Sequence, residues 1–364
     1  WLAEFFSAGV SVVVILAVLF YSINWLISKL ILWNNRRRLN RDLHPLYTEA
    51  EIDKATRYYI PTKYQDTAPS QDEEPSINSK GSPKSKLIPT MLKKSFRQDD
   101  NRYYLILSDS GMGKTTFMLN LILAYKNQWP WKKKFDIQLL PLGHPKVLEK
   151  MAKIQNPKNT ILLLDALDED AEALKDYKKR LKEILDKTDE LEFREVVITC
   201  RTQFFPSEVE EPKKTGVLKF GTEGGQFQFW KKYISVFDDK DVRLYLRKRF
   251  KFYQWKSRIK AKRIVQKSPN LMVRPMLLSH IQKLVNEDRE FQYTYQIYEV
   301  LIKAWIEREA EKPGIELKYG AKENFVDLLQ KFTDSLAIDL LENKEKRGGS
   351  QLIHKDEEII KSSG

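Results

Sequence analysis

Four apolar runs between residues 103 and 201 alternate with stretches of helical periodicity. Each run is short enough for a strand and ends in small or charged residues. The runs are Tyr103–Leu107, Phe135–Leu142, Thr160–Asp165 and Glu195–Arg201. Between them, apolar residues recur at helical spacing in residues 114–125, 148–154 and 172–187. Strands that alternate with helices form parallel sheets flanked by helices, so this region predicts an α/β fold.

An uncharged apolar stretch, Phe5–Ser28, precedes this region. About 24 helical residues extend about 36 Å, which is enough to cross a bilayer with some tilt. Arginines follow from Arg36 onward, whereas Glu4 is the charged residue on the other side. This bias predicts a transmembrane helix at residues 1–34, with the rest of the chain in the cytosol. A cleaved signal peptide would carry its positive charges before the apolar run, and a buried core helix is usually shorter.

The pattern after this helix divides the rest of the chain. We expect a juxtamembrane segment and flexible linker at 35–90, an α/β domain at 91–237, a helical domain at 238–290 and the start of a further helical domain at 291–364. Residues 61–89 are rich in Pro, Ser and charge and have few large apolar residues, which is typical of a flexible tether. Amphipathic stretches at 295–311 and 325–341 indicate two helices in the last part. We expect this part to continue beyond Gly364.

The composition narrows the compartment and the kind of partner. The chain has 364 residues, a net charge of +13 and a pI near 9.4. This charge favours an acidic partner such as nucleic acid, anionic lipid or a nucleotide, without choosing among them. One cysteine, Cys200, excludes an internal disulfide framework and fits a reducing compartment. The four histidines are scattered and stand beside no cysteine or carboxylate cluster, so a zinc or iron site is not expected.

The loop after the first apolar run carries the pattern SDSGMGKTT. A strand, a glycine-rich loop and a helix in this order place backbone N–H groups and a helix N-terminus around the phosphates of a nucleotide. Lys114 would contact the β- and γ-phosphate oxygens, and the Thr115 hydroxyl would bind Mg²⁺. Ser108 stands where GxxxxGK(S/T) has its first glycine, so the loop is a variant of the Walker A motif. A glycine-rich turn without a ligand is the alternative. The expected nucleotide contacts are Ser108, Asp109, Ser110, Gly111, Met112, Gly113, Lys114, Thr115 and Thr116.

Charged residues follow the third and fourth runs. Asp165 ends the third run at the carboxyl edge of the predicted sheet, next to the phosphate loop, where it would hold Mg²⁺ together with Thr115. Asp168 and Glu169 come just after it, and one of them, Glu169 as first choice, would orient the attacking water. Arg201 ends the fourth run and would contact the γ-phosphate. The alternatives are a solvated acidic turn and a surface arginine at a strand end.

The succession of SDSGMGKTT, ILLLDALDED and VVITCRTQFF resembles the NACHT-type members of the STAND NTPases. In that family a small residue follows the metal-binding aspartate, and an acidic pair stands three and four residues after it. Ala166, Asp168 and Glu169 take these places here. ABC transporters and most AAA+ proteins have a catalytic glutamate directly after the aspartate, and Ras-like GTPases have an NKxD motif that is missing here. The resemblance extends from about Tyr103 to Leu340.

This resemblance implies an α/β P-loop NTPase that binds ATP or GTP with Mg²⁺, hydrolyses it slowly and continues into a partial winged-helix domain. It also implies that Pro275, in the segment NLMVRPMLL, packs near the nucleotide. The chain is similar as well to bacterial membrane-anchored NACHT proteins, which are often thought to be antiviral defence switches and some of which carry pentapeptide repeats. We therefore expect a single-pass protein of the cell membrane with a cytoplasmic NTPase domain that forms a homo-oligomer when an unknown trigger activates it.

The segment Arg243–Arg263 interleaves basic and aromatic residues and contains no acidic residue. A helical subdomain with solvated charges is the favoured interpretation. The other two interpretations are that the segment binds single-stranded nucleic acid or that it binds anionic lipid. The sequence thus favours a membrane-anchored, NACHT-like ATPase that acts as a nucleotide-dependent oligomerisation switch. The alternative is a nucleic-acid-binding membrane scaffold with a weak or vestigial phosphate loop.

Overall fold

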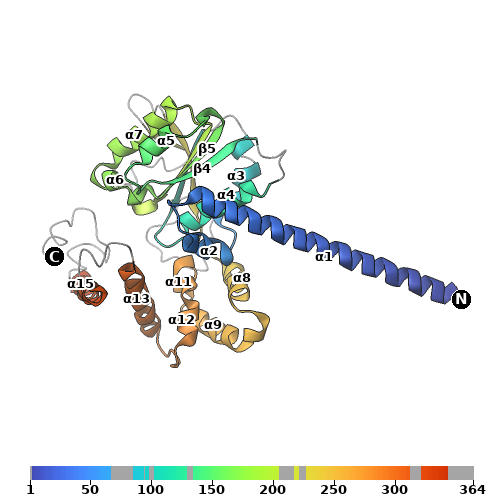
Figure 1. Cartoon of the computed structure of the whole chain (residues 1–364). Coiled ribbons are helices and arrows are strands. Elements are labelled where there is room, and N and C mark those ends of the chain that lie inside the picture. The colour runs from blue at the N-terminus through green and yellow to red at the C-terminus, as the bar shows by residue number, and fades with distance from the viewer. Residues whose placement is uncertain are drawn as a thin grey trace. The chain divides into compact units, whose positions relative to one another are not determined.

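The chain forms two compact units in the computed structural model (Figure 1). Among the described residues, those up to Val236 belong to the first unit and those from Phe237 onward to the second. The structure describes residues 2–66, 85–93, 95–97, 102–128, 134–204, 217–220, 227–311 and 321–342.

The first unit is built on a sheet with the strand order β2-β1-β8-β3-β6-β5-β4, in which β7 also pairs with β8. The strands are β1 (Lys63–Gln65), β2 (Ser85–Lys86), β3 (Tyr103–Ser108), β4 (Asp136–Pro141), β5 (Thr160–Asp165), β6 (Glu195–Arg201), β7 (Val217–Phe220) and β8 (Phe227–Ile234). The strands from β8 to β4 are parallel along this order, whereas β1, β2 and β7 pair in antiparallel. The parallel sheet predicted from the four apolar runs is confirmed, and β8 is a fifth parallel strand that the pattern did not predict.

Helices cover both faces of this sheet. They are α1 (Leu2–Leu43), α2 (Glu49–Arg57), α3 (Leu87–Lys93), α4 (Lys114–Lys126), α5 (Val147–Ala152), α6 (Ala171–Lys175) and α7 (Tyr177–Glu190). One apolar cluster joins α2, α3, α4 and the end of α1 to the sheet, and a second joins α5, α6 and α7 to the opposite face. Every residue of β3 and β5 is buried, because successive side chains of a strand enter the two clusters in turn.

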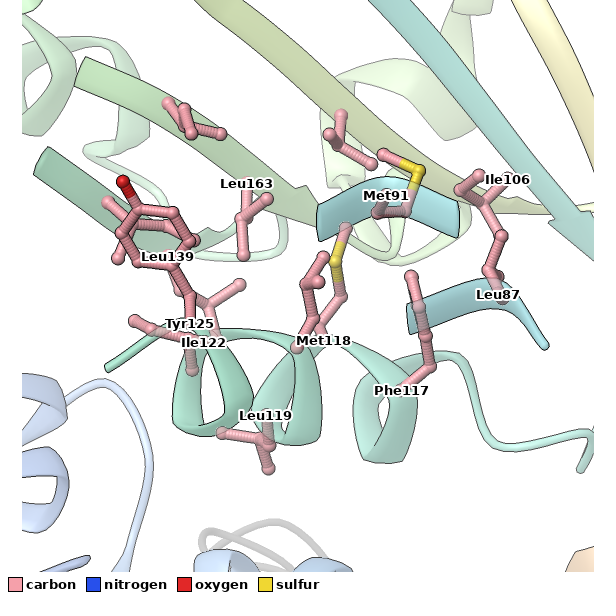
Figure 2. Close-up of a cluster of buried hydrophobic side chains, with 14 of the residues drawn as sticks. Leu87, Met91, Ile106, Phe117, Met118, Leu119, Ile122, Tyr125, Leu139 and Leu163 are labelled. Atoms are coloured by element: carbon pink, nitrogen blue, oxygen red, sulfur yellow. The ribbon is translucent and has the colours of Figure 1, made fainter. Parts of the chain in front are cut away.

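The first of these clusters fixes the helix that follows the phosphate loop (Figure 2). Phe117 and Met118 of α4 lie with Met91 of α3 against the sheet, where Ile106 and Leu163 meet them. Burial of such side chains contributes about 1.5–3 kcal/mol each, so α4 and the loop before it are held firmly on β3.

One predicted helix is in fact two. The periodicity over residues 172–187 predicts a single helix, but α6 ends at Lys175 and α7 begins at Tyr177. The residue between them, Asp176, has an extended backbone, and its side chain accepts a hydrogen bond of 3.0 Å from the backbone N–H of Lys179. An aspartate that caps a helix start in this way ends the preceding helix.

The segment after α1 is part of the first unit. Within the predicted juxtamembrane segment, α1 continues to Leu43 and a short helix, α2, follows. Leu39, Leu43 and Ile52 are buried in the cluster that also contains α4. The α2 helix starts with a capping box between Thr48 and Glu51, which explains why an ordered helix forms here. Residues 67–84 of the predicted linker lie outside the described residues.

The membrane-spanning helix predicted at residues 1–34 is not supported. Among the residues that the structure describes, no helix combines the length and the apolar character that crossing a bilayer requires. The side chains of residues 1–15, which include the first part of the predicted span, lie outside the described set.

The second unit is helical, as the pattern predicts. Its helices are α8 (Asp239–Arg249), α9 (Trp255–Lys267), α10 (Pro269–Met272), α11 (Pro275–Ser279), α12 (Ile281–Asn286), α13 (Thr294–Ala310) and α15 (Lys322–Glu342). The last two correspond to the amphipathic stretches predicted at 295–311 and 325–341. Residues 312–320 and 343–364 of the predicted winged-helix region lie outside the described residues.

A buried acid stands at the start of β6, at the end of the strand opposite to Arg201. Glu195 is buried, and neither of its carboxylate oxygens has a hydrogen-bond partner in the described part of the chain. Burial raises the pKa of Glu195 from 4.5 to about 8, although Arg194 opposes the shift. Ionisation of Glu195 therefore favours the unfolded chain, in which the carboxylate is solvated.

Protonated Glu195 should contribute fully to the free energy of unfolding below about pH 4.5. This contribution should be lost as the pH rises towards 8. Glu195→Gln should remove this loss and raise the melting temperature at pH 8–9 by a few degrees, with little effect at pH 5. Thermal unfolding across this pH range measures the effect. Glu149→Gln, at an exposed position on α5, is the matched control. Parallel pH profiles for the Glu195 variant and the wild type would contradict the prediction.

Candidate functional site

The loop between β3 and α4 has the backbone that phosphate binding requires. Gly111 and Gly113 both adopt left-handed conformations, with φ of 77° and 89°, which side chains other than glycine rarely adopt. Met112, between them, is buried in the core and anchors the loop. The Gly113 carbonyl accepts the backbone N–H of Phe117 at 2.8 Å, so the first turn of α4 starts directly from the loop. The N–H groups at this helix start are free to face an anion.

The departure from the Walker A pattern at Ser108 has a simple structural reason. Ser108 is the last residue of β3 and pairs in register with Arg201 of β6. Its backbone is therefore extended. Any residue can adopt this conformation, so this position does not require glycine. Its hydroxyl donates a hydrogen bond of 3.2 Å to the carbonyl of Asp109.

Asp165 lies at the centre of the site and is buried. Its Oδ1 accepts the Thr199 hydroxyl at 2.8 Å, and its Oδ2 accepts the Tyr47 hydroxyl at 3.3 Å. The hydroxyl of Thr115 also donates to it. Burial raises the pKa of Asp165, whereas these hydroxyls and the charge of Lys114 act in the opposite direction. The structure thus brings together Thr115 and Asp165, the two predicted metal ligands.

This oxygen pair fits a magnesium ion. Mg²⁺ prefers carboxylate and hydroxyl oxygens, keeps several waters and takes further ligands from substrate phosphates, so two protein ligands are sufficient. A buried carboxylate whose ionised form is disfavoured by burial would also be stabilised by a cation beside it. The described residues contain no cluster of three or more His, Cys, Asp or Glu side chains with metal-binding spacing.

Asp168 connects the two cations of the site. Its Oδ1 lies 3.6 Å from the Lys114 Nζ, and its Oδ2 lies 2.7 Å from the Arg201 Nε. The backbone N–H of Arg201 also donates to Asp168 Oδ1 at 3.1 Å. Strand order explains this arrangement, because β6 lies between β3 and β5. Arg201, at the end of β6, therefore lies between the phosphate loop that follows β3 and Asp165 at the end of β5.

A tight turn after β5 separates the roles of the two acids that follow. Ala166 has a left-handed backbone with φ of 60°, and the 3-10 turn η4 (Leu167–Glu169) begins directly after it. Leu167 is buried and fixes the turn, so Asp168 faces the cations while Glu169 remains exposed. Although Glu169 is exposed, the surrounding protein partly shields its carboxylate from water. This shielding and the charges of the neighbouring Asp168 and Asp165 raise the pKa of Glu169.

The described geometry unites Lys114, Thr115, Asp165, Asp168 and Arg201 at one sheet edge. Asp109, Ser110 and Thr116 belong to the loop and the first turn of α4. Pro275 is the first residue of α11 in the second unit, and its role at a nucleotide stays a prediction.

Sequence reasoning missed two residues of the site. Thr199 is a fully buried polar residue in an apolar strand, and a polar side chain in such a place needs a partner, which was a usable signal. Tyr47 lies outside the predicted nucleotide-binding domain, and nothing local in the sequence marks it. Burial and the charge of Asp165 raise the pKa of Tyr47, so the phenol remains protonated and acts as a donor.

These observations define a P-loop α/β fold for the first unit. The phosphate-binding backbone, the helix that starts from it, and the acidic residue at the carboxyl edge of a parallel sheet are the features that decide this.

Comparisons with known proteins add little to this geometry. No protein-family profile matches the chain, and no curated protein is significantly similar to it in sequence. Two variants of RuvB from Thermotoga maritima match in structure at 15% and 13% identity, each with a TM-score of 0.32, over 64% of this chain and 75% of theirs. A third variant matches at 12% identity with a TM-score of 0.29, over 64% and 76%. Similarity at this level carries no functional argument, so the assignment depends on the geometry of the chain itself.

Thr199→Val tests the structural part of the site. The Thr199 hydroxyl donates to Asp165 and accepts the backbone N–H of Ala166 at 2.8 Å. Removing it leaves both groups buried without this partner, which should lower the free energy of unfolding by about 1–3 kcal/mol. Thr199→Ser keeps the hydroxyl and should lose less. Urea denaturation measures both, and an equal loss in the two variants would contradict the role given to the hydroxyl.

Proposed function

We propose that the chain is a Mg²⁺-dependent nucleoside triphosphatase, with ATP as the first choice of substrate and GTP as the second. The observation that carries the proposal is the contact between Thr115 and Asp165 beside the ion pairs of Lys114 and Arg201 with Asp168. Metal ligands and phosphate-binding cations thus meet where a phosphate loop opens a helix. Such a combination serves phosphoryl transfer, in which the protein positions groups and stabilises charge.

Each residue has a distinct task in this proposal. The backbone N–H groups of residues 109–114 surround the phosphates, and Lys114 contacts the terminal ones. Thr115 and Asp165 would hold Mg²⁺, which supplies charge neutralisation at the phosphate oxygens. Arg201 neutralises charge at the γ-phosphate. Glu169, exposed and with a raised pKa, orients the water and takes its proton.

A slow nucleotide switch of the NACHT type is the form of this activity that we favour. Its support is the placement of the acidic pair after Ala166, whose backbone is left-handed. Asp168 is paired with Arg201, whereas Glu169 is exposed. In this scheme nucleotide exchange or hydrolysis converts a monomer into a homo-oligomer, as part of a bacterial defence or signalling response. Light scattering with and without a non-hydrolysable analogue tests it, and an unchanged mass in every nucleotide state would contradict it.

Attachment to the cell membrane through α1, with the nucleotide-binding unit in the cytoplasm, completes the proposal. Its support is the large number of exposed apolar side chains among the described residues of α1, which is typical of a contact with lipid or another chain. These residues are Leu16, Val18, Leu19, Phe20, Ile23, Trp25, Leu26, Ile27, Leu30, Ile31 and Trp33. Arg37 stacks over Trp33 at 4.0 Å, the pairing of a cation with an aromatic ring expected at a lipid interface. Failure of the full chain to float with liposomes would exclude this part.

Lys114→Ala tests nucleotide binding. Loss of a charge-assisted contact with the terminal phosphates should weaken ATP binding about 10- to 100-fold, as measured by isothermal titration in the presence of Mg²⁺. Lys153→Ala removes an exposed lysine from the same unit and should leave the affinity unchanged. Equal affinity in the two variants would refute the phosphate-loop assignment.

Glu169→Gln separates hydrolysis from binding. The amide keeps the shape of the side chain but cannot take a proton, so kcat should fall about 10²- to 10⁴-fold while ATP affinity stays near the wild-type value. Phosphate release and titration with the nucleotide measure the two effects. Glu172→Gln, on an exposed carboxylate three residues further, is the control. If kcat is unaffected, the general base is another group.

A further inference from the structure

A basic groove lies between α8 and α9 in the second unit. It has a volume of about 420 Å³ and is lined by Lys240, Arg243, Leu246, Arg247, Arg258 and Lys262. Five of these residues are cations, and no carboxylate lines the groove. In the part of the chain that the structure describes, none of the five cations forms an ion pair. Like charges in a shared concave site repel one another, so the groove is suited to an anion.

Two of the three acidic residues at the start of α8 take part in capping the helix. Asp238 and Asp241 form the capping box at the start of α8, in which each carboxylate accepts a backbone N–H of the other residue. Lys240, Arg243 and Arg247 follow at spacings of three and four residues, so they share one face of the helix. The packing of α8 does not require these three cations, because buried residues such as Leu246 make the contact with the interior of the second unit.

Exposed aromatic rings stand where the chain passes from α8 to α9, the two helices that line the groove. The turn between the two helices, η6 (Phe252–Gln254), presents Phe252 at 86% exposure and Tyr253 at 60%, and Trp255 at the start of α9 is 53% exposed. Trp255 lies three and seven residues before Arg258 and Lys262, so the ring shares their face of α9. Large rings exposed beside cations offer stacking surfaces for nucleic-acid bases.

We propose that this groove binds the phosphate backbone of single-stranded nucleic acid while the aromatic turn stacks on its bases. The shape favours this ligand over a lipid surface, because cations that line one concave groove on two helices can surround a strand more closely than a flat membrane. The exposed rings favour a single strand over a duplex, whose base faces are already stacked. DNA and RNA share this chemistry, and the experiment below includes both.

The test uses the full chain and fluorescein-labelled oligothymidylate and oligouridylate, with fluorescence anisotropy measured at several salt concentrations. If all five cations contact phosphates, the logarithm of the association constant should fall with that of salt with a slope of about −3.5. The double variant Arg243→Gln with Arg258→Gln should bind more weakly, and its slope should be less steep by about 1.4. Trp255→Ala should weaken binding about tenfold.

A matched control separates the groove from net charge. Lys153→Gln with Lys182→Gln removes two exposed cations from the first unit and should bind the oligonucleotides as the wild type does. Unchanged ATP affinity of the groove variant shows that its first unit is folded. Equal losses in the groove and control variants would overturn the proposal. So would equal binding of single strands and duplex with no effect of Trp255→Ala. The proposal would also be overturned if the groove variant bound phosphatidylserine vesicles more weakly than the wild type but bound the oligonucleotides equally well.

Discussion

The arrangement of the proposed nucleotide site depends on one buried carboxylate, that of Asp165. A carboxylate in the interior is stable only when hydrogen-bond donors or cations surround it. Here the donors are Thr115 of α4, Thr199 of β6 and Tyr47 of the segment after α1. A single group therefore ties three separate elements to the end of β5. Because burial still raises its pKa, a cation bound beside it would remove part of an existing electrostatic cost.

The second constraint is the internal pairing of the cations. Lys114 and Arg201, which would contact phosphates, are both paired with the almost fully buried Asp168. A triphosphate bound as proposed would compete with this carboxylate, so part of its interaction energy would be used to replace an existing ion pair. The arrangement follows from the parallel register that sets Ser108 opposite Arg201, because this register brings the strand end and the phosphate loop to the same edge.

The sequence was informative where the chemistry is local. Gly111 and Gly113 mark the phosphate loop because left-handed backbone needs glycine, and apolar runs mark buried parallel strands. The sequence was not informative where the structure depends on contacts between residues far apart in the chain. The β8 strand interrupts its apolar pattern with Lys231, which is nevertheless buried, with its Nζ donating to the Tyr233 hydroxyl at 3.3 Å. Nor could spacing show that β6 lies between β3 and β5, or that Tyr47 reaches Asp165.

That last contact changes how the N-terminal segment is to be understood. Leu39 and Leu43, on the last turns of α1, are buried in the same cluster as Met118 of α4, and Tyr47 continues from them to Asp165. The end of α1 is thus packed against the helix that follows the phosphate loop, and the segment directly after α1 contacts the carboxylate of Asp165. A close-packed interior transmits displacement, since it has few voids to absorb it. We therefore expect a movement of α1 relative to the sheet to alter the surroundings of Asp165, whatever the exposed part of that helix contacts.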